Sequence, residues 1–388
     1  MPAPDRRPLI AHVMHRFDTG GLENGVVNLI NHMPEDRYRH AVVALTDVTG
    51  FRDRVKRRDV EFVALRKPAG QGVWQFPKWY RMLRRMRPDI VHTRNLAALE
   101  CQIPAWGARI PVRIHGEHGR DVGDLDGSNR TYQRVRRFYR PFVHHYLALS
   151  RDLAQYLSQA IHVPDSRITQ VYNGVDTSRF QPAPEGPVPI QDCPFHPAQH
   201  WIVGTVGRMQ AVKDQVMLAR AFVHALELDP TLKARLRLVM VGDGPLRAQA
   251  QAVLQDAGVA GLAWMPGERS DVADIMRGLH LFALPSLAEG ISNTVLEAMA
   301  SALPVIATDV GGNADLVVQG ETGQLVAAAD PLAMARQLLR LAHQPEQAQL
   351  MGHAGRQRVE SQFSMQAMVT NYQRVYDEQL RRIGAVNG

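Results

Sequence analysis

Residues 285–312 read PSLAEGISNTVLEAMASALPVIATDVGG, and this stretch carries the pattern that decides the fold class. It begins where the apolar run LHLFALP (279–285) ends and contains the helix-like NTVLEAMA (293–300). A second apolar run, LPVIATD (303–309), follows the helix-like part. A short apolar strand, a helix and another strand in succession predict one repeat of a parallel α/β sheet.

The same alternation continues on both sides of this stretch. Short apolar runs separated by helix-like segments predict parallel sheets covered by helices on both faces. In the second half the further runs are WIVGTVG (201–207), LRLVMVG (236–242) and LAWMP (262–266). In the first half they are PLIAHVMH (8–15), HAVVALT (40–46), VEFVAL (60–65), DIVHT (89–93), PVRIH (111–115), HHYLALS (144–150) and ITQVYN (168–173).

Residues 181–200 interrupt the alternation. The segment holds six of the 24 prolines, so a helix or strand cannot persist through it. We therefore expect two Rossmann-like domains, 1–185 and 186–388, with a helix at about 365–383 near the end. Ligands of open parallel sheets bind beyond the carboxyl ends of the strands, so the cleft between two such domains is the expected site.

Composition narrows the class of protein. The 388 residues are 45% apolar and 21% charged, which is ordinary for a globular chain. Two cysteines, Cys101 and Cys193, exclude a disulfide framework. No apolar run reaches the ~18 residues of a membrane span, and the N-terminal run reads as a strand rather than a signal peptide. A cytoplasmic location is expected.

Charge is divided unevenly along the chain. Residues 1–186 carry a net charge of +10 and residues 187–388 a net charge of −3. The basic half predicts contact with something anionic, such as a phosphorylated acceptor, an anionic bilayer or a nucleic acid. The basic stretch 132–140, with Arg134, Arg136, Arg137 and Arg140, fits an anionic lipid surface. No RNA-binding motif accompanies it, so no nucleic-acid partner is expected.

Two common nucleotide fingerprints are missing from the sequence. Neither GxGxxG nor GxxxxGK[ST] occurs, which disfavours hydride transfer on a dinucleotide and P-loop phosphoryl transfer. The DxD triplet Asp124–Asp126 lies in the first half, away from the segments that suit a nucleotide, and we expect no metal site there.

The loop and helix of 285–312 could hold a phosphate. Ser292 and Asn293 suit a helix N-cap, which would present backbone amides and the positive end of the helix dipole. Glu289, beside Gly290, could accept hydrogen bonds from sugar hydroxyls, and Glu297 from a ribose hydroxyl. The amides concerned are those of Asn293, Thr294 and Val295. A polar loop with a solvated helical glutamate is the alternative interpretation.

A second segment, VGTVGRMQAVKDQ (203–215), places cations after a strand. Arg208 and Lys213 follow Gly207 closely enough to converge on a diphosphate. Gly242 in VGDGPL (241–246) marks a similar turn after the next strand. Taken alone, an exposed surface loop would explain these residues as well.

Two segments of the first half offer further candidates. Gly20 and Gly21 stand between the first strand and a helix, where glycine lets a backbone approach a ligand closely. His115 and His118 follow a later strand, and either could serve as a histidine of the site. Tight turns and structural histidines are the alternatives, because the chain has 16 histidines.

Together and in this order, these segments resemble the retaining glycosyltransferases of family 4, which have the GT-B fold. The segments are GGLE (20–23), EHG (117–119), NGVD (173–176), GR…K (207–213), VGDGP (241–245) and E-G…LEAMA (289–300). GGLENGVVNLIN and IHGEHGRDVGDLDGSN are also similar to sugar transferases of exosortase-associated exopolysaccharide systems.

The resemblance implies a donor, an acceptor and a set of roles. A nucleoside diphosphate sugar would bind the C-terminal domain without a required metal or other cofactor, and a lipid-linked or glycan acceptor the N-terminal one. The last helix would pack back on the first domain. By position in the family motifs, Arg208 and Lys213 would bind the diphosphate, which the backbone at Gly20 and Gly21 would also approach. Glu289 would bind the sugar hydroxyls, and Glu297 would bind the ribose. The histidine falls on His118, with His115 as the reserve.

Two departures from the family pattern concern the donor sugar. Asp315 follows Gly-Gly-Asn-Ala where a glutamate is more usual, and ISNT (291–294) replaces a run of small residues. The base, sugar and acceptor therefore stay open. A same-fold epimerase or sugar-phosphate synthase, and a basic nucleic-acid-binding protein, are the alternative functions.

Overall fold

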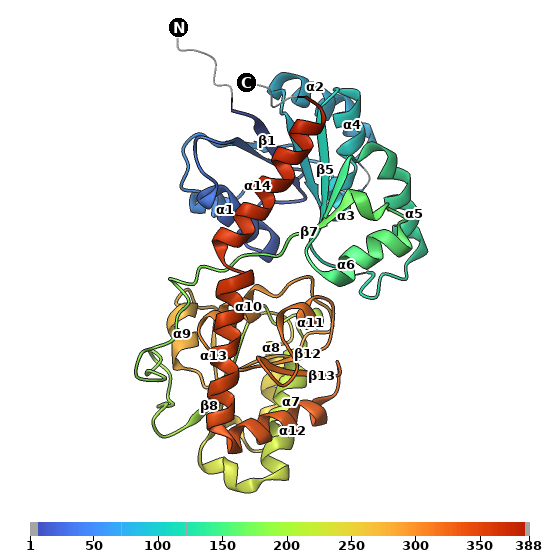
Figure 1. Cartoon of the computed structure of the whole chain (residues 1–388). Coiled ribbons are helices and arrows are strands. Elements are labelled where there is room, and N and C mark those ends of the chain that lie inside the picture. The colour runs from blue at the N-terminus through green and yellow to red at the C-terminus, as the bar shows by residue number, and fades with distance from the viewer. Residues whose placement is uncertain (1–6, 71, 122, 385–388) are drawn as a thin grey trace. The chain divides into compact units, whose positions relative to one another are not determined.

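The computed structural model describes residues 7–70, 72–121 and 123–384, which form two α/β units (Figure 1). Unit 1 comprises the chain up to Gly174 together with the segment from Met365 onward, and unit 2 comprises Val175–Ser364. Each unit contains one sheet in which every strand pair is parallel, so the expected α/β fold with two parallel sheets is confirmed.

The sheet of unit 1 has seven strands in the order β3-β2-β1-β4-β5-β6-β7. The strands are β1 (Leu9–Met14), β2 (Arg39–Ala44), β3 (Glu61–Ala64), β4 (Ile90–Arg94), β5 (Val112–Glu117), β6 (His145–Ala148) and β7 (Ile168–Gln170). The helices are α1 (Gly21–His32), α2 (Phe76–Met86), α3 (Asn95–Leu99), α4 (Gln102–Gly107), α5 (Arg130–Tyr139), α6 (Arg151–Gln155) and α14 (Met365–Arg382).

The two faces of this sheet build separate cores. Alternate residues of β1 point to opposite faces, so Ile10 packs with α1 and α14, whereas Ala11 and Val13 pack with α2, α3 and α4. The helix α14 contributes Met368, Tyr372 and Tyr376, among others at helical spacing, to the first of these cores. The end of the chain is therefore an integral part of unit 1.

The sheet of unit 2 has six strands in the order β10-β9-β8-β11-β12-β13, with α7, α8 and α12 packed on one face. The strands are β8 (Trp201–Val206), β9 (Leu236–Val241), β10 (Ala263–Gly267), β11 (Leu281–Leu284), β12 (Val305–Thr308) and β13 (Gly323–Val326). The helices are α7 (Gln215–Leu228), α8 (Arg247–Asp256), α9 (Val272–Gly278), α10 (Asn293–Ala300), α11 (Asn313–Leu316), α12 (Pro331–His343) and α13 (Pro345–Gln362).

The proline-rich segment lies wholly within unit 2. Residues 181–200, all of which the structure describes, form no helix or strand. The segment packs on unit 2, because the Val188 amide donates to the Arg277 carbonyl and a Cβ at Gly278 would meet Ile190. The division of the chain consequently falls at 174/175, earlier than the expected 185/186.

Three histidines inside unit 1 are held in the neutral form. Arg94, 1% exposed, donates from Nη2 to His12 Nδ1 at 3.0 Å and to His92 Nδ1 at 3.3 Å. Since His12 Nδ1 accepts, its Nε2 carries the proton and donates to His40 Nδ1 at 3.0 Å. Burial first, and then neighbouring arginines, lower the pKa of all three imidazoles, that of His40 to about 3.

This network predicts loss of stability in mild acid. In the unfolded chain these histidines titrate near their ordinary value, about 6.5, so the unfolded state binds more protons below that pH. The stability they contribute is present above about pH 6.5 and is lost as the pH falls toward the folded value. For His40 alone the loss at pH 5 is about 2 kcal/mol, which lowers the melting temperature by roughly 4–8 °C.

A substitution isolates the contribution of His40. In His40→Asn the amide oxygen still accepts from His12 but does not titrate, so we expect a shallower fall in melting temperature between pH 7.5 and 5. The exposed His353→Asn is the matched control and should keep the wild-type slope. A slope in His40→Asn equal to that of the wild type would contradict the prediction.

Candidate functional site

The strand order of unit 2 reverses between β8 and β11. From β8 the chain proceeds to β9 and β10 on one side, whereas β11 leads to β12 and β13 on the other. The loops that leave the carboxyl ends of β8 and β11 therefore diverge, and such a switch point is where open parallel sheets bind ligands. The residues predicted for the donor in the second half follow β8, β9 and β11 at this edge.

Two glycines bring the loops after β8 and β9 together. Gly207, with φ +155°, donates from its amide to the Val241 carbonyl, and Gly242, with φ +129°, follows it on the next strand. A Cβ on Gly242 would lie 2.0 Å from the Gly207 carbonyl oxygen. Any side chain at 242 would thus force these loops apart, which explains the glycine in VGDGP.

The loop after β8 presents both predicted cations. Arg208 is exposed, and its carbonyl accepts from Gln215 Nε2 at 3.0 Å. Lys213 ends a short 3₁₀ turn just before α7, and its Nζ lies 2.6 Å from Glu289 Oε1. The structure therefore joins two residues that are 76 positions apart in the sequence and that the motifs had selected independently.

The loop that carries Glu289 is tied down on two sides. The Leu287 amide donates to the Val212 carbonyl at 2.8 Å, which fixes the loop to the one that carries Lys213. On the other side Gly311, with φ +52°, lies so close that a Cβ would be 1.9 Å from the Glu289 carbonyl oxygen. Gly290 completes this tightly packed loop before α10.

The helix α10 begins as predicted, with one difference in its amides. Ser292 is the N-cap, and its Oγ accepts from the Val295 amide at 3.3 Å. The expectation that the Val295 amide is free is therefore wrong, because the cap hydroxyl already engages it. Asn293 and Thr294 occupy the first turn, and Glu297 lies one turn further on, half-buried.

The remaining predicted residues belong to unit 1. Gly20 is the N-cap of α1, which begins at Gly21. His118 follows β5, where its amide donates to Asn95 Oδ1 at 2.8 Å. Its Nε2 is buried and has no partner among the described residues, and burial and then Arg94 hold the pKa of His118 well below its ordinary value.

The structure separates His118 from its reserve candidate. His115 is fully buried, with Nδ1 bonded to Thr93 Oγ1 at 2.8 Å and Nε2 to Glu117 Oε1 at 3.3 Å. Both nitrogens of His115 are thus used within the core. Only one of the two histidines keeps a ring nitrogen without a partner in the described chain, and it is His118.

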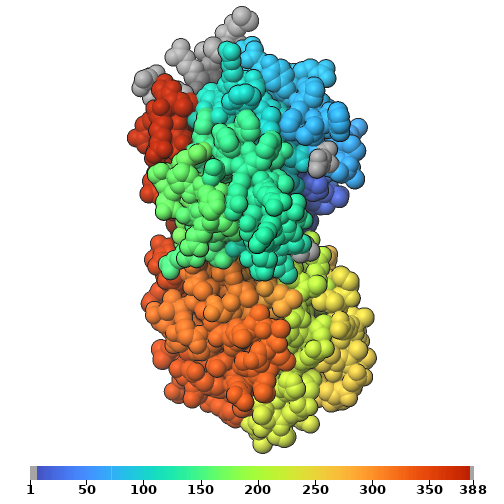
Figure 2. All heavy atoms as spheres, turned by 90° about the vertical axis from the view of Figure 1, so that its right-hand side faces the viewer, coloured from blue at the N-terminus to red at the C-terminus, as the bar shows by residue number. Residues whose placement is uncertain are grey.

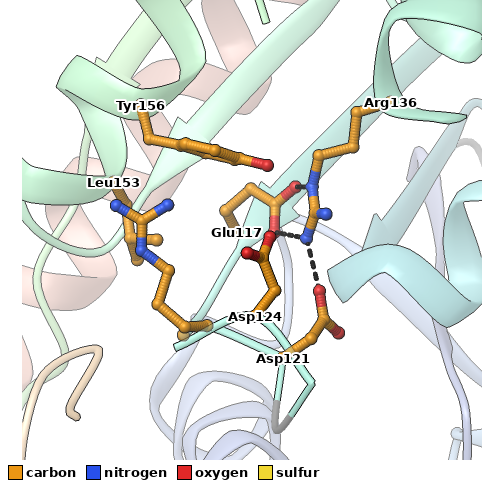
Figure 3. Close-up of a pocket in the computed structure, with 8 residues that line it drawn as sticks. Glu117, Asp121, Asp124, Arg136, Leu153 and Tyr156 are labelled. Carbon is orange, nitrogen blue, oxygen red and sulfur yellow. Dashed lines mark hydrogen bonds and ion pairs between the residues drawn. The ribbon is translucent and has the colours of Figure 1, made fainter. Parts of the chain in front are cut away.

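A charged cluster that the sequence did not predict lies beneath the loop after β5 (Figure 3). Glu117, 1% exposed, accepts from Arg136 Nε at 2.6 Å, and Arg136 Nη2 also reaches Asp121 at 2.8 Å. Burial alone would raise the pKa of Glu117, but the Arg136 guanidinium lowers it. The Tyr156 ring lies 4.2 Å from the Arg120 guanidinium, so the cluster anchors the loop that carries His118.

This cluster corrects the interpretation of the basic stretch. Arg136 is 4% exposed because α5 turns it toward β5, so it cannot contact a lipid surface. Arg137 and Arg140 bond to the carbonyls of Ala160 and His162. A buried arginine at this position is signalled only by the glutamate that ends the preceding strand, a weak signal in a chain with 45 Lys and Arg.

The DxD triplet has a local structural role. Asp124 Oδ1 accepts from the Asn129 amide at 2.8 Å, and Asp126 Oδ1 accepts from the Ser128 amide and hydroxyl. Both aspartates thus stabilise turns. Across residues 7–70, 72–121 and 123–384, no group of three or more His, Cys, Asp or Glu side chains is arranged to hold a metal ion.

A cavity of about 380 Å³ lies at the opposite edge of the unit 2 sheet. Trp201 at the start of β8 and Pro304 before β12 line it, together with Pro182 and Pro184 of the proline-rich segment. None of the predicted site residues lines this cavity. The candidate site of unit 2 is instead the edge where β8 and β11 end.

Two family models match the chain, one in each half. The model described as Glycosyltransferase Family 4 matches residues 19–179, and the one described as Glycosyl transferases group 1 matches residues 200–344. The solved structure of HepE from Anabaena, in complex with UDP and glucose, superimposes with a TM-score of 0.80 at 19% identity. That likeness covers 96% of this chain and 100% of HepE.

Curated relatives are similar over most of the chain. EpsD of Bacillus subtilis, named as a glycosyltransferase, is 25% identical over 71% of this chain and 74% of its own length. A GDP-mannose-dependent alpha-mannosyltransferase of Mycobacterium tuberculosis is 28% identical over 79% and 80%. An Escherichia coli UDP-Gal:alpha-D-GlcNAc-diphosphoundecaprenol alpha-1,3-galactosyltransferase is 26% identical over 68% of each. Further relatives match over about half of their length.

The close approach of Gly311 to Glu289 generates a prediction for stability. In Gly311→Ala the new Cβ overlaps the Glu289 carbonyl, and relieving such an overlap costs about 1–3 kcal/mol. We expect a melting temperature several degrees below that of the wild type. Gly320→Ala is the control, because it shares a positive φ of +79° but meets open space. Equal melting temperatures in the two variants would contradict the assigned contact.

Proposed function

The chain belongs to the glycosyltransferases of group 1 and family 4, and from this membership we propose its reaction. It moves a sugar from a nucleoside diphosphate sugar to a lipid-linked or glycan acceptor, with retention at the anomeric carbon. The product serves exopolysaccharide or cell-envelope glycan synthesis. The observation that carries the proposal is the meeting of Lys213 with Glu289 beside the start of α10, at the switch point of unit 2.

The residues at this edge suit a departing diphosphate. When the bond between the anomeric carbon and the phosphate oxygen breaks, negative charge develops on the diphosphate. Lys213, Arg208 and the first turn of α10 supply positive charge and amide donors for it. We propose that these groups replace a metal ion in this role. Glu289 accepts from sugar hydroxyls, and Glu297 from the ribose.

Retention needs no nucleophile from the protein. The acceptor hydroxyl forms its bond to the anomeric carbon on the face that the diphosphate leaves, and its proton passes to a phosphate oxygen. Gly20 and Gly21, at the start of α1, carry no side chain that would keep the backbone from the diphosphate. Burial and then Arg94 lower the pKa of His118, so this histidine is neutral. Its unpartnered Nε2 donates a hydrogen bond to a hydroxyl of the donor sugar.

The relatives support the donor and acceptor classes of this proposal. HepE was solved with UDP and glucose, and the mycobacterial relative depends on GDP-mannose. The Escherichia coli relative acts on a sugar linked to diphosphoundecaprenol. A uridine or guanosine donor and a polyprenyl-linked acceptor are therefore the first pair to test.

Binding of nucleotides to Lys213→Ala tests the donor site. A ligand at about 100 times its Kd adds roughly 2.7 kcal/mol of stability and raises the melting temperature by several degrees. We expect one of UDP, GDP, ADP and CMP to produce this shift in the wild type and not in Lys213→Ala. Lys233→Ala, which removes an exposed lysine elsewhere in unit 2, should keep the shift. A full shift in Lys213→Ala would refute the diphosphate assignment.

Unit 1 also supports peripheral contact with an anionic membrane. Trp74, Trp106 and Phe138 are 88%, 56% and 61% exposed, and Tyr80 is exposed beside them on α2. The same helix buries Trp79 and Leu83 and exposes Arg81, Arg84 and Arg85. We call these exposed aromatic and arginine side chains the aromatic-basic face. Such a combination inserts rings at the interface and attracts anionic headgroups.

The elements of the aromatic-basic face adjoin one another. Trp106 on α4 packs its ring against Phe142 at a centroid distance of 5.5 Å, and Phe138 on α5 lies 6.4 Å from the same ring. Figure 2 shows the segments around α4 and α5, coloured teal to green, on one outer face of unit 1. Among the described helices, none has the length and apolar character needed to span a bilayer. We place the protein at the cytoplasmic face of the membrane, held by this surface.

Vesicle binding tests the aromatic-basic face. At low salt we expect the protein to sediment with phosphatidylglycerol vesicles and to stay in solution with phosphatidylcholine vesicles. Trp106→Ser combined with Phe138→Ser should lower the bound fraction about fivefold or more, since both rings leave the interface. Leu350→Ser, at a 70% exposed position of unit 2, should not change it. Equal sedimentation with both lipids would contradict the prediction.

A further inference from the structure

The cation and the carboxylate of the donor site neutralise each other. Lys213 Nζ lies 2.6 Å from Glu289 Oε1, and Ser286 Oγ donates to the same oxygen at 2.6 Å. The Glu289 side chain is 8% exposed and that of Lys213 is 29% exposed. A carboxylate this buried needs a compensating charge or hydrogen bonds, and Lys213 supplies the charge.

The loop around Glu289 leaves its carboxylate little freedom to move away. The Leu287 amide is bonded to the Val212 carbonyl, and Gly311 packs directly on the Glu289 backbone. Thr308 Oγ1 also donates to the Ser286 carbonyl at 2.5 Å. Glu289 therefore keeps its position whether or not a ligand is present, and Lys213, the more exposed partner, is the one that can turn away.

The nucleoside diphosphate sugar and the nucleoside diphosphate product affect the Lys213–Glu289 ion pair differently. A diphosphate draws Lys213 toward itself and brings several negative charges close to Glu289. With a nucleoside diphosphate sugar, the sugar hydroxyls donate to Glu289 and take over the role of the lysine. With the nucleoside diphosphate alone, nothing replaces the lysine, and Glu289 remains a buried carboxylate beside like charge.

We propose that Glu289 acts as a charge gate that discriminates the sugar-bearing donor from the nucleoside diphosphate product. The Glu289 carboxylate repels the nucleoside diphosphate that is left after transfer. This repulsion speeds release of the nucleoside diphosphate and limits inhibition by accumulated nucleotide. This inference rests on the proposed function, because it requires that the diphosphate bind beside Lys213. Glu289 thereby has two roles. It binds the sugar hydroxyls of the donor, and it weakens binding of the nucleoside diphosphate product.

The gate predicts a gain of affinity from a substitution inside the site. In Glu289→Gln the negative charge is removed while the side-chain oxygen can still accept from Ser286. We expect the full chain to bind the nucleoside diphosphate about tenfold more tightly, because Lys213 is released and the repulsion is gone. The nucleoside diphosphate sugar should bind no more tightly, because its hydroxyls lose a charged acceptor.

Calorimetric titration of the full chain measures the affinity for the nucleoside diphosphate, with UDP and GDP, and for the nucleoside diphosphate sugar, with UDP-glucose and GDP-mannose. Glu227→Gln, an exposed position near the end of α7, removes the same charge from unit 2 and should change the affinities less than twofold. Glu289→Ala repeats the test without the amide, in case the glutamine variant does not fold. Inhibition of transfer by the diphosphate should become about tenfold stronger in the same variants.

The outcomes separate the inference from its premise. Unchanged or weaker diphosphate binding in both Glu289 variants would overturn the charge gate and leave the donor site standing. Equal tightening in Glu227→Gln would also overturn it, because the effect would then come from overall charge. If the wild type bound none of these nucleotides, the donor assignment itself would fail, and the gate with it.

Discussion

The reversal of strand order between β8 and β11 is the constraint on which the site of unit 2 depends. Because all strands are parallel, every loop that follows a strand emerges at one edge, and only at the reversal do neighbouring loops diverge. Lys213 lies on the loop after β8 and Glu289 on the loop after β11. Lys213 Nζ lies 2.6 Å from Glu289 Oε1 at this reversal. Gly242 and Gly311 exist at this edge because larger side chains would overlap the backbones of Gly207 and Glu289.

Unit 1 is built by the same rule but stabilised by different means. Its sheet reverses between β1 and β4, and the buried residues near that point are Arg94 and the histidines around it, rather than an ion pair. Burial first, and then the arginine, lowers the pKa of His12 and His92 and keeps them neutral, and His118 shares that environment. The closing helix α14 covers this core, and Tyr376 donates to His92 from it at 2.8 Å. The last helix therefore completes the electrostatic environment of the first unit.

Much of this could be predicted from the sequence, and the exceptions have physical causes. Strands and the proline-rich break are local patterns, so the α/β fold followed from periodicity alone. Lys213 and Glu289 were each selected by a motif, but their contact was not predicted, because it depends on two loops meeting. Arg136 was misplaced because its partner Glu117 is 19 residues away, and only the turn of α5 buries the pair. The division at 174/175 was missed because 181–200 packs on unit 2, which composition cannot show.

The most direct test of this account is a crystal structure of the full chain with the nucleoside diphosphate that stabilises it. We expect the diphosphate at the carboxyl ends of β8 and β11, with Lys213 turned from Glu289 toward one phosphate oxygen and the first turn of α10 donating to another. A diphosphate bound elsewhere, with the Lys213–Glu289 pair intact, would contradict it. That result would mean that the switch point of unit 2 is not the donor site.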